Sequence, residues 1–179
     1  MIVGSLRKEA FSRRVAEAMR AMQPASLNLE IVEIRDLPLY NQDLETDNPP
    51  AAWTAFRHAV SAHDAVLFVS PEYNRSIPGP LKNAIDVGSR PYGKASLPGK
   101  PCAVVTTSPG ALGGFGANHQ IRQAVVFLDM PTMLMPELYV GGVDKVVAAD
   151  KTVQADTRQL FEKFLQKFAT WIERNIAKA

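Results

Sequence analysis

The sequence predicts a single α/β domain, residues 1–179, in which helices cover both faces of a parallel sheet. Short apolar runs alternate with helical patterns along all 179 residues, which is the arrangement of repeated βα units. The run at 65–69 is apolar throughout, as expected of a strand buried on both faces. No internal repeat, low-complexity segment or linker divides the chain, and its length suits one domain with a sizeable core.

Five short apolar segments are predicted as strands: 1–3, 29–34, 65–69, 101–107 and 133–135, with 138–140 as an optional extension of the last. Right-handed crossovers between them leave few topologies. With five strands, the natural choice is a flavodoxin-like three-layer sandwich with a parallel sheet in the strand order 2-1-3-4-5. The first and third strands are then neighbours, and a ligand would bind beyond their carboxyl ends.

Five segments carry the apolar spacing of helices: 6–22, 51–62, 80–87, 117–128 and 160–176. Pro24 should stop the first helix, and the second should open after a pair of prolines. The last helix has the clearest pattern, because its apolar positions form one continuous stripe. The members of this stripe are Leu160, Phe161, Phe164, Leu165, Phe168, Trp171, Ile172 and Ile176.

Composition argues against several classes of protein. Twenty Lys and Arg face eighteen Asp and Glu without a basic cluster, so nucleic-acid binding has no electrostatic support. The single cysteine, Cys102, excludes an internal disulfide and suits a reducing cytoplasm, where it should be a small core residue. No apolar stretch reaches about 18 residues, so no membrane span is expected, and no signal peptide is visible. His58, His63 and His119 lack metal-ligand spacing, so no metal site is expected.

The loop after the first strand reads GSLRKEAFS, residues 4–12. Gly4 permits a tight turn, and the amides beyond it open a helix, which is a ready anion site. Ser5 and Ser12 add hydroxyl groups, and Arg7 adds a permanent charge suited to phosphate oxygens. The alternative, weighed about equally, is a helix N-cap at Ser5 with a solvated Arg7. The loop lacks both the P-loop and the G-x-G-x-x-G pattern.

Two further loops are predicted at the same edge of the sheet. Residues 71–86 read PEYNRSIPGPLKNAID, in which the amides of Glu72, Tyr73 and Asn74 would lie beside the first loop. Residues 106–116 read TTSPGALGGFG, whose glycines would let the backbone approach a ligand closely. Each loop alone could be a turn without further function. Together at one edge they predict a ligand site.

These segments resemble the NADPH-dependent FMN reductase family, which includes bacterial quinone, azo-dye and chromate reductases. The matching stretches are GSLRKEAFSRR, PEYNRSIPGPLKNAID and SPGALGG…IRQAVVFLDM. They span nearly the whole chain in the family's order, and the PEYN segment is the most specific. The resemblance implies a flavodoxin-like fold, non-covalent FMN, and a homodimer or homotetramer.

The resemblance also implies the cofactor-binding residues. These are Ser5, Leu6, Arg7 and Ser12 in the first loop, Pro71, Glu72, Tyr73 and Asn74 in the second, and Ser108 and Gly110 in the third. In the first loop, Ser5, Arg7 and Ser12 would hold the FMN phosphate. The second loop would line the isoalloxazine ring, largely through backbone groups. The third loop would border the pyrimidine end of the ring.

The chemistry implied is a hydride transfer from NADPH or NADH to FMN and onward to a small-molecule acceptor, by ping-pong turnover. The acceptor would be a quinone, free flavin, azo dye or chromate, and no catalytic side chain is required. The alternative is a non-enzymatic flavodoxin-type carrier, or an FMN-binding protein without activity. Such carriers are strongly acidic, whereas this chain has a pI of about 8.7.

Two departures from the family pattern stand out. Only three residues precede Gly4, whereas a central strand usually has about five or six, so a start further upstream is one expectation. The family often has a tryptophan where Val87 or Gly88 stands.

The apolar run after Gly116, with residues 121–135, exceeds what one helix and one short strand need, which points to subunit contacts. His119 and Glu137 flank that run and could pair across such a contact, although two solvated residues are favoured slightly.

Overall fold

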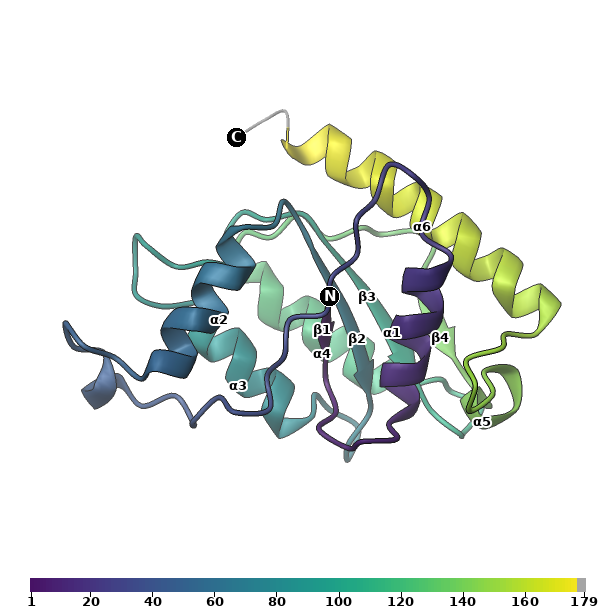
Figure 1. The fold of residues 1–179 in the computed structure, drawn as a ribbon, viewed down its shortest axis with the longest axis horizontal. Helices are drawn as coiled ribbons and strands as arrows, with labels where there is room; N and C mark the ends of the chain where they lie inside the picture. The colour runs from purple at the N-terminus through teal and green to yellow at the C-terminus, as the bar shows by residue number, and fades with distance from the viewer. Residues whose placement is uncertain (177–179) are drawn as a thin grey trace.

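A computed structural model, which describes residues 1–176, places helices on both sides of a central parallel sheet (Figure 1). None of the helices in the described part of the chain is long and apolar enough to cross a membrane. The elements in chain order are β1 (Ile2–Val3), α1 (Phe11–Ala21), the 3₁₀ turn η1 (Gln42–Leu44), α2 (Ala51–Ser61), β2 (Val66–Pro71), α3 (Gly79–Gly88), β3 (Cys102–Thr107), α4 (Phe115–Val126), β4 (Leu138–Val140), α5 (Val143–Val146) and α6 (Ala155–Ile176).

The prediction of five strands in the order 2-1-3-4-5 is wrong, because the sheet has four strands in the order β1-β2-β3-β4. The expected second strand, residues 29–34, makes a single parallel bridge between Val32 and Ile2. β1 has only two residues, so a neighbour finds little backbone to pair with. The Leu29 N–H donates instead to the side-chain oxygen of Gln23 at 2.6 Å. The segment therefore runs along β1 as an irregular edge.

The last strand also differs from the expectation at 133–135, since only the second part of that prediction, Leu138–Val140, forms a strand as β4. Proline has no backbone N–H to donate to a ladder, and Pro131 and Pro136 flank the expected segment. Between them, Thr132 makes one isolated bridge with Cys102.

The first helix begins later than predicted, at Phe11 rather than Leu6, because the intervening residues form the loop after β1. The other helices lie within a few residues of the predicted ranges, although α6 begins earlier, at Ala155. The confirmed helices are those whose apolar spacing is strong and local.

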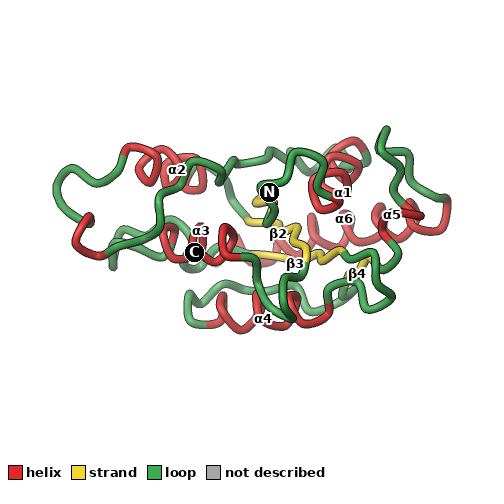
Figure 2. The backbone as a smooth tube through the Cα atoms, turned by 90° about the horizontal axis from the view of Figure 1, so that it is seen from below, coloured by secondary structure: helices red, strands yellow, loops and turns green. Residues whose placement is uncertain are grey.

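Strand residues alternate between two apolar clusters, one on each face of the sheet. On β2, Leu67 and Val69 join the cluster that includes α1 and α6, whereas Val66 and Phe68 join the cluster that includes α2, α3 and α4. The helices thus cover both faces of the sheet, and its edges are left for loops (Figure 2).

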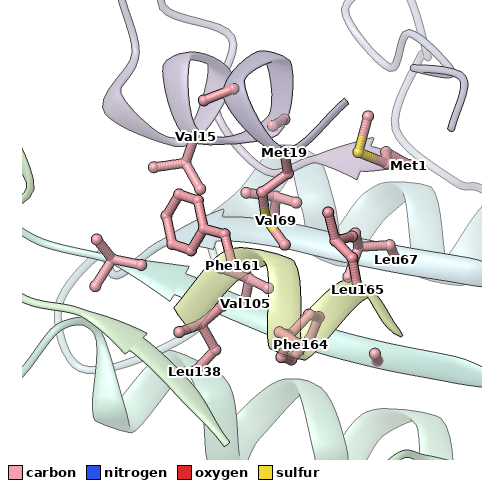
Figure 3. Packing of buried hydrophobic residues seen from close by; sticks show 14 of the residues in the cluster. Met1, Val15, Met19, Leu67, Val69, Val105, Leu138, Phe161, Phe164 and Leu165 are labelled. Atoms are coloured by element: carbon pink, nitrogen blue, oxygen red, sulfur yellow. The ribbon is translucent and has the colours of Figure 1, made fainter. Parts of the chain in front are cut away.

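Helix α6 closes one face of the sheet with the buried part of its apolar stripe. Figure 3 shows Phe161, Phe164 and Leu165 packed against β2, β3 and α1. The ends of the predicted stripe are less buried, since Leu160 is 41% exposed and Ile176 is 40% exposed. The central aromatic residues therefore provide most of the apolar contact between α6 and the sheet.

We expect Phe161→Ala to lower the free energy of unfolding by about 3–5 kcal/mol, because it leaves a cavity in a fully buried site. Denaturant-induced unfolding measures this change. Leu160→Ala is the matched control on the same helix and should cost less than about 1 kcal/mol. Equal losses for the two variants would contradict the packing described here.

Candidate functional site

The carboxyl ends of β1, β2 and β3 release three loops at one edge of the sheet. Parallel register sets β1 beside β2 and pairs Pro71 of β2 with Thr107 of β3. The Gly4 N–H donates to the Val69 carbonyl at 2.9 Å, so the first loop leaves the sheet directly beside the second. The strands end at the lower edge of the sheet in Figure 1, and Figure 2 views the molecule from that side. The expected neighbourhood of the first two loops is therefore present.

The first loop requires a glycine where it leaves β1. A Cβ atom on Gly4 would lie 2.5 Å from the Ser70 hydroxyl oxygen, closer than such contacts allow. Beyond it, the Arg7 N–H donates to Ser5 Oγ at 3.3 Å. Ser5 is not the N-cap of α1, because that helix begins at Phe11 and its N-cap is Ala10. The alternative reading of Ser5 as the N-cap is thus wrong, while Arg7 is exposed at the mouth of the loop.

Ser12 carries a polar atom that lacks a partner within the described residues. Its side chain is fully buried, and Oγ makes no hydrogen bond. A buried hydroxyl without a partner costs stability, so such a group calls for an explanation. Ser12 lies in the first turn of α1, where no side chain caps the helix. A ligand that offers a hydrogen-bond acceptor would satisfy both the hydroxyl and the helix amides.

The second loop folds into a tight turn. Tyr73 and Ser76 exchange backbone hydrogen bonds of 3.1 and 3.0 Å. The two residues between them have left-handed backbones, with φ of 50° at Asn74 and 64° at Arg75. Two successive positive φ values are typical of a type I′ turn, which most side chains disfavour. The turn presents Tyr73, which is 43% exposed, beside the first loop.

A contact between hydroxyl groups joins the first and second loops. Tyr73 Oη lies 3.3 Å from Ser5 Oγ. The structure thus brings together residues that the sequence analysis assigned to different parts of one ligand. Glu72 departs from this pattern, because its carboxylate faces α4 and accepts from the Ala117 N–H at 3.0 Å.

The third loop packs against β4 as well as against β3. The Ser108 N–H donates to the Val140 carbonyl at 3.0 Å, and the Gly110 N–H donates to Ser108 Oγ at 3.0 Å. At Gly113, φ is 58° and a Cβ would lie 2.6 Å from the Tyr139 carbonyl carbon, so only glycine fits there. Ser108 and Gly110 therefore occupy the expected edge, next to the second loop.

The sequence analysis missed one polar group at this edge. Thr107, the last residue of β3, is buried, and its hydroxyl makes no hydrogen bond within the described residues. It directly precedes Ser108 at the start of the third loop. The signal in the sequence was the pair Thr106 and Thr107, which ends an otherwise apolar strand. Like the Ser12 hydroxyl, the Thr107 hydroxyl could be satisfied by a ligand at the carboxyl edge.

The single cysteine lies away from these three loops. Cys102 is fully buried in β3, which agrees with its predicted place in the core. Burial raises the pKa of its thiol to about 11. Within residues 1–176, no group of three or more His, Cys, Asp or Glu side chains could hold a metal ion. A cavity of about 440 Å³ lies at the opposite, amino edge of the sheet and is lined by residues such as Met1, Asp64 and Phe168.

Comparisons with known proteins agree with this geometry. The family model of NADPH-dependent FMN reductases matches residues 1–145. A quinone reductase of Pseudomonas putida is 56% identical over 177 residues, which cover 99% of this chain and 95% of that protein. A 2-hydroxy-1,4-benzoquinone reductase of Burkholderia sp. is 39% identical over 173 residues, which cover 96% of this chain and 94% of that reductase.

Solved structures extend the likeness to three dimensions. FerB, a flavoenzyme NAD(P)H:(acceptor) oxidoreductase of Paracoccus denitrificans, is 37% identical and has a TM-score of 0.91. The match covers 97% of this chain and 96% of FerB. A flavodoxin of Pseudomonas aeruginosa, at 18% identity and a TM-score of 0.57, covers 96% of each chain and is similar in fold alone. The fold is thus flavodoxin-like.

We expect Cys102 to resist alkylation by iodoacetamide at pH 8 in the folded protein. Its raised pKa leaves little thiolate, and burial excludes the reagent. Intact-protein mass measures the modification, and the same protein in denaturant is the control that should react fully. Stoichiometric alkylation of the folded chain at the rate of a free thiol would contradict the buried position.

Proposed function

Because the chain belongs to the NADPH-dependent FMN reductase family, we propose that it uses NADPH or NADH to reduce quinones through bound FMN. The observation that carries this proposal is the 56% identity with a quinone reductase over 99% of the chain. That likeness includes all three loops at the carboxyl edge. Free flavin, azo dyes and chromate are further candidate acceptors, and the cytoplasm is the proposed location.

The first loop is proposed to bind the FMN phosphate. The buried Ser12 hydroxyl, which has no partner among residues 1–176, supports this assignment, since a phosphate oxygen would accept its hydrogen bond. Ser5 and the exposed Arg7 lie on the same loop, and Arg7 adds a charge that pairs with phosphate. Leu6 belongs to the same segment and packs its side chain against the core. The residues present therefore fit the phosphate end of FMN.

The second and third loops are proposed to hold the ring. Pro71, Glu72, Tyr73 and Asn74 run from the end of β2 into the Tyr73–Ser76 turn beside the first loop, and Asn74 has a left-handed backbone. Ser108 and Gly110 would border the pyrimidine end. The unpartnered Thr107 hydroxyl adds a hydrogen-bonding group next to Ser108. Each part of FMN thus has a polar or flat protein surface suited to it.

When bound, FMN supplies the hydride transfer between nicotinamide and acceptor. The chain's own residues then have to bind and orient, and no side chain of the three loops has to act as an acid or a base. The nicotinamide donor and the electron acceptor would bind in turn at the same carboxyl edge of the sheet. A flavodoxin-type carrier finds less support, because the chain carries a net charge of +2 and is not acidic.

A homodimer or homotetramer is also proposed. Part of the apolar run considered above is in the core, since Ile121 and Val125 are fully buried. Another part is unusually exposed: Val126 72%, Phe127 75%, Leu134 70% and Met135 71%. Apolar side chains this exposed and close together in the sequence are candidates for a contact surface. Within one chain, His119 lies 3.4 Å from the Tyr139 hydroxyl, so a bond from His119 to Glu137 of another copy stays a secondary expectation.

Arg7→Ala should weaken FMN binding about ten- to a hundredfold, because it removes charge-assisted hydrogen bonds to phosphate. Fluorescence titration of the apoprotein with FMN measures the affinity. Lys8→Ala is the matched control, since Lys8 is the neighbouring exposed cation without an assigned role. Unchanged FMN affinity in the Arg7 variant would refute its phosphate role.

Steady-state kinetics with 1,4-benzoquinone test the reaction itself. We expect NADPH-dependent reduction with parallel double-reciprocal plots, because donor and acceptor would use the same edge in turn. A panel of quinones, free FMN, azo dyes and chromate at saturating NADPH would rank the acceptors. Intersecting plots would count against a shared site. No NADPH oxidation with any acceptor would leave the carrier and the FMN-binding protein without activity as the alternatives.

Sedimentation at micromolar concentration tests the assembly. Wild-type protein should sediment as a dimer or larger. Phe127→Asp should shift it toward the 19.6 kDa monomer, because it places a charge among the exposed apolar side chains of residues 126–135. Leu160→Asp, on α6, is the control and should leave the assembly unchanged. A wild-type monomer with full FMN and full activity would contradict the proposal.

A further inference from the structure

Helix α4 begins without a cap of its own. Its N-cap residue is Gly114, which has no side chain, and no side chain within the helix caps the first turn. The first amides of any helix have no intrahelical partner and need one from elsewhere. The start of α4 is buried at Ala117, so water does not offer an easy substitute. The missing acceptor has to come from another segment of the chain.

Glu72 supplies that acceptor from 45 residues earlier in the sequence. The Ala117 N–H, the third amide of α4, donates to Glu72 Oε2 at 3.0 Å. This is the position that a capping side chain normally serves, and a carboxylate there also interacts favourably with the helix dipole. The Glu72 side chain is only 12% exposed. The bond therefore joins the second loop to the helix that follows the third loop.

The same side chain also touches the turn that follows it. Glu72 Oε1 lies 3.4 Å from Arg75 Nη1. The turn and the helix are close in their backbones as well, since a Cβ on Gly116 would lie 2.7 Å from the Arg75 carbonyl oxygen. Left-handed conformations such as those of Asn74 and Arg75 persist only where surrounding contacts hold them. The Glu72 side chain provides one such contact.

We propose that Glu72 is a positioning residue for the flavin. Its carboxylate caps α4 and so holds the Tyr73–Ser76 turn in the geometry that receives the ring. Glu72 acts through reach and hydrogen bonding rather than through contact with the cofactor, because its oxygens face Ala117 and Arg75. The role toward FMN rests on the proposed function of the three loops.

Two conservative variants separate reach from charge. Glu72→Gln keeps the length of the side chain and an oxygen that accepts from Ala117, but loses the charge. Glu72→Asp keeps the charge but is shorter by one carbon, about 1.5 Å. Asp86→Asn is the control, because Asp86 forms an exposed pair with Lys82 on α3, Nζ to Oδ1 at 2.7 Å, and has no assigned role.

The affinity of the folded apoprotein for FMN is the main readout, with the visible spectrum of the bound flavin as the second. We expect Glu72→Asp to weaken FMN binding about tenfold and to alter the spectrum, and Glu72→Gln to weaken it less than about threefold. Circular dichroism and the melting temperature of the apoprotein establish that both variants fold. A role limited to folding would lower the melting temperature without changing the affinity of the folded fraction.

Every other pattern overturns the proposal. Affinities equal to wild type in both variants would show that the cap does not position the flavin site. A larger loss in Glu72→Gln than in Glu72→Asp would assign the effect to charge. An equal loss in both would show that the reach of the side chain is not what matters. If wild-type protein itself fails to bind FMN, the proposed function falls and with it this role for Glu72. The capping of α4 by Glu72 can be tested without FMN. If it holds, the Ala117 amide should exchange faster in Glu72→Asp than in Glu72→Gln.

Discussion

The backbone pairing between β1 and β2 decides where the rest of the site can lie. It ends with the Gly4 N–H bonded to the Val69 carbonyl at 2.9 Å, and the missing side chain of Gly4 lets the Ser70 hydroxyl approach. Parallel strands end at the same edge, so two loops separated by about sixty residues of chain emerge side by side. The hydroxyl contact between Ser5 and Tyr73 follows from that pairing. A slip of one residue would turn every core side chain of β1 to the wrong face.

The sheet divides its side chains between two apolar clusters, and that division leaves the carboxyl edge free for polar groups. Helices α1 and α6 cover one face, while α2, α3 and α4 cover the other. At the edge, the hydroxyls of Ser12 and Thr107 are buried without a partner in the described chain, which costs stability. A cofactor that offers acceptors at both places would recover that cost on binding. Binding of such a cofactor would therefore be coupled to the stability of this edge.

How much of this could be read from the sequence depends on how local each signal is. The stripe of α6 and the range of α2 follow from spacing within one segment, and the neighbourhood of the first and third predicted strands is confirmed by β1 and β2. The strand expected at 29–34 fails because β1 is too short to pair with it. The capping of α4 by Glu72 was missed because its partner, Ala117, lies 45 residues away and gives no local pattern.

Hydrogen exchange with and without FMN tests the central claim most directly, namely that the three loops at the carboxyl edge form the cofactor site. The account predicts slower amide exchange on FMN binding within residues 4–12, 71–76 and 106–116. It predicts no change around Met1 and Asp64, which line the cavity at the amino edge. Protection concentrated at that amino edge, or absent from the three loops at saturating FMN, would contradict it.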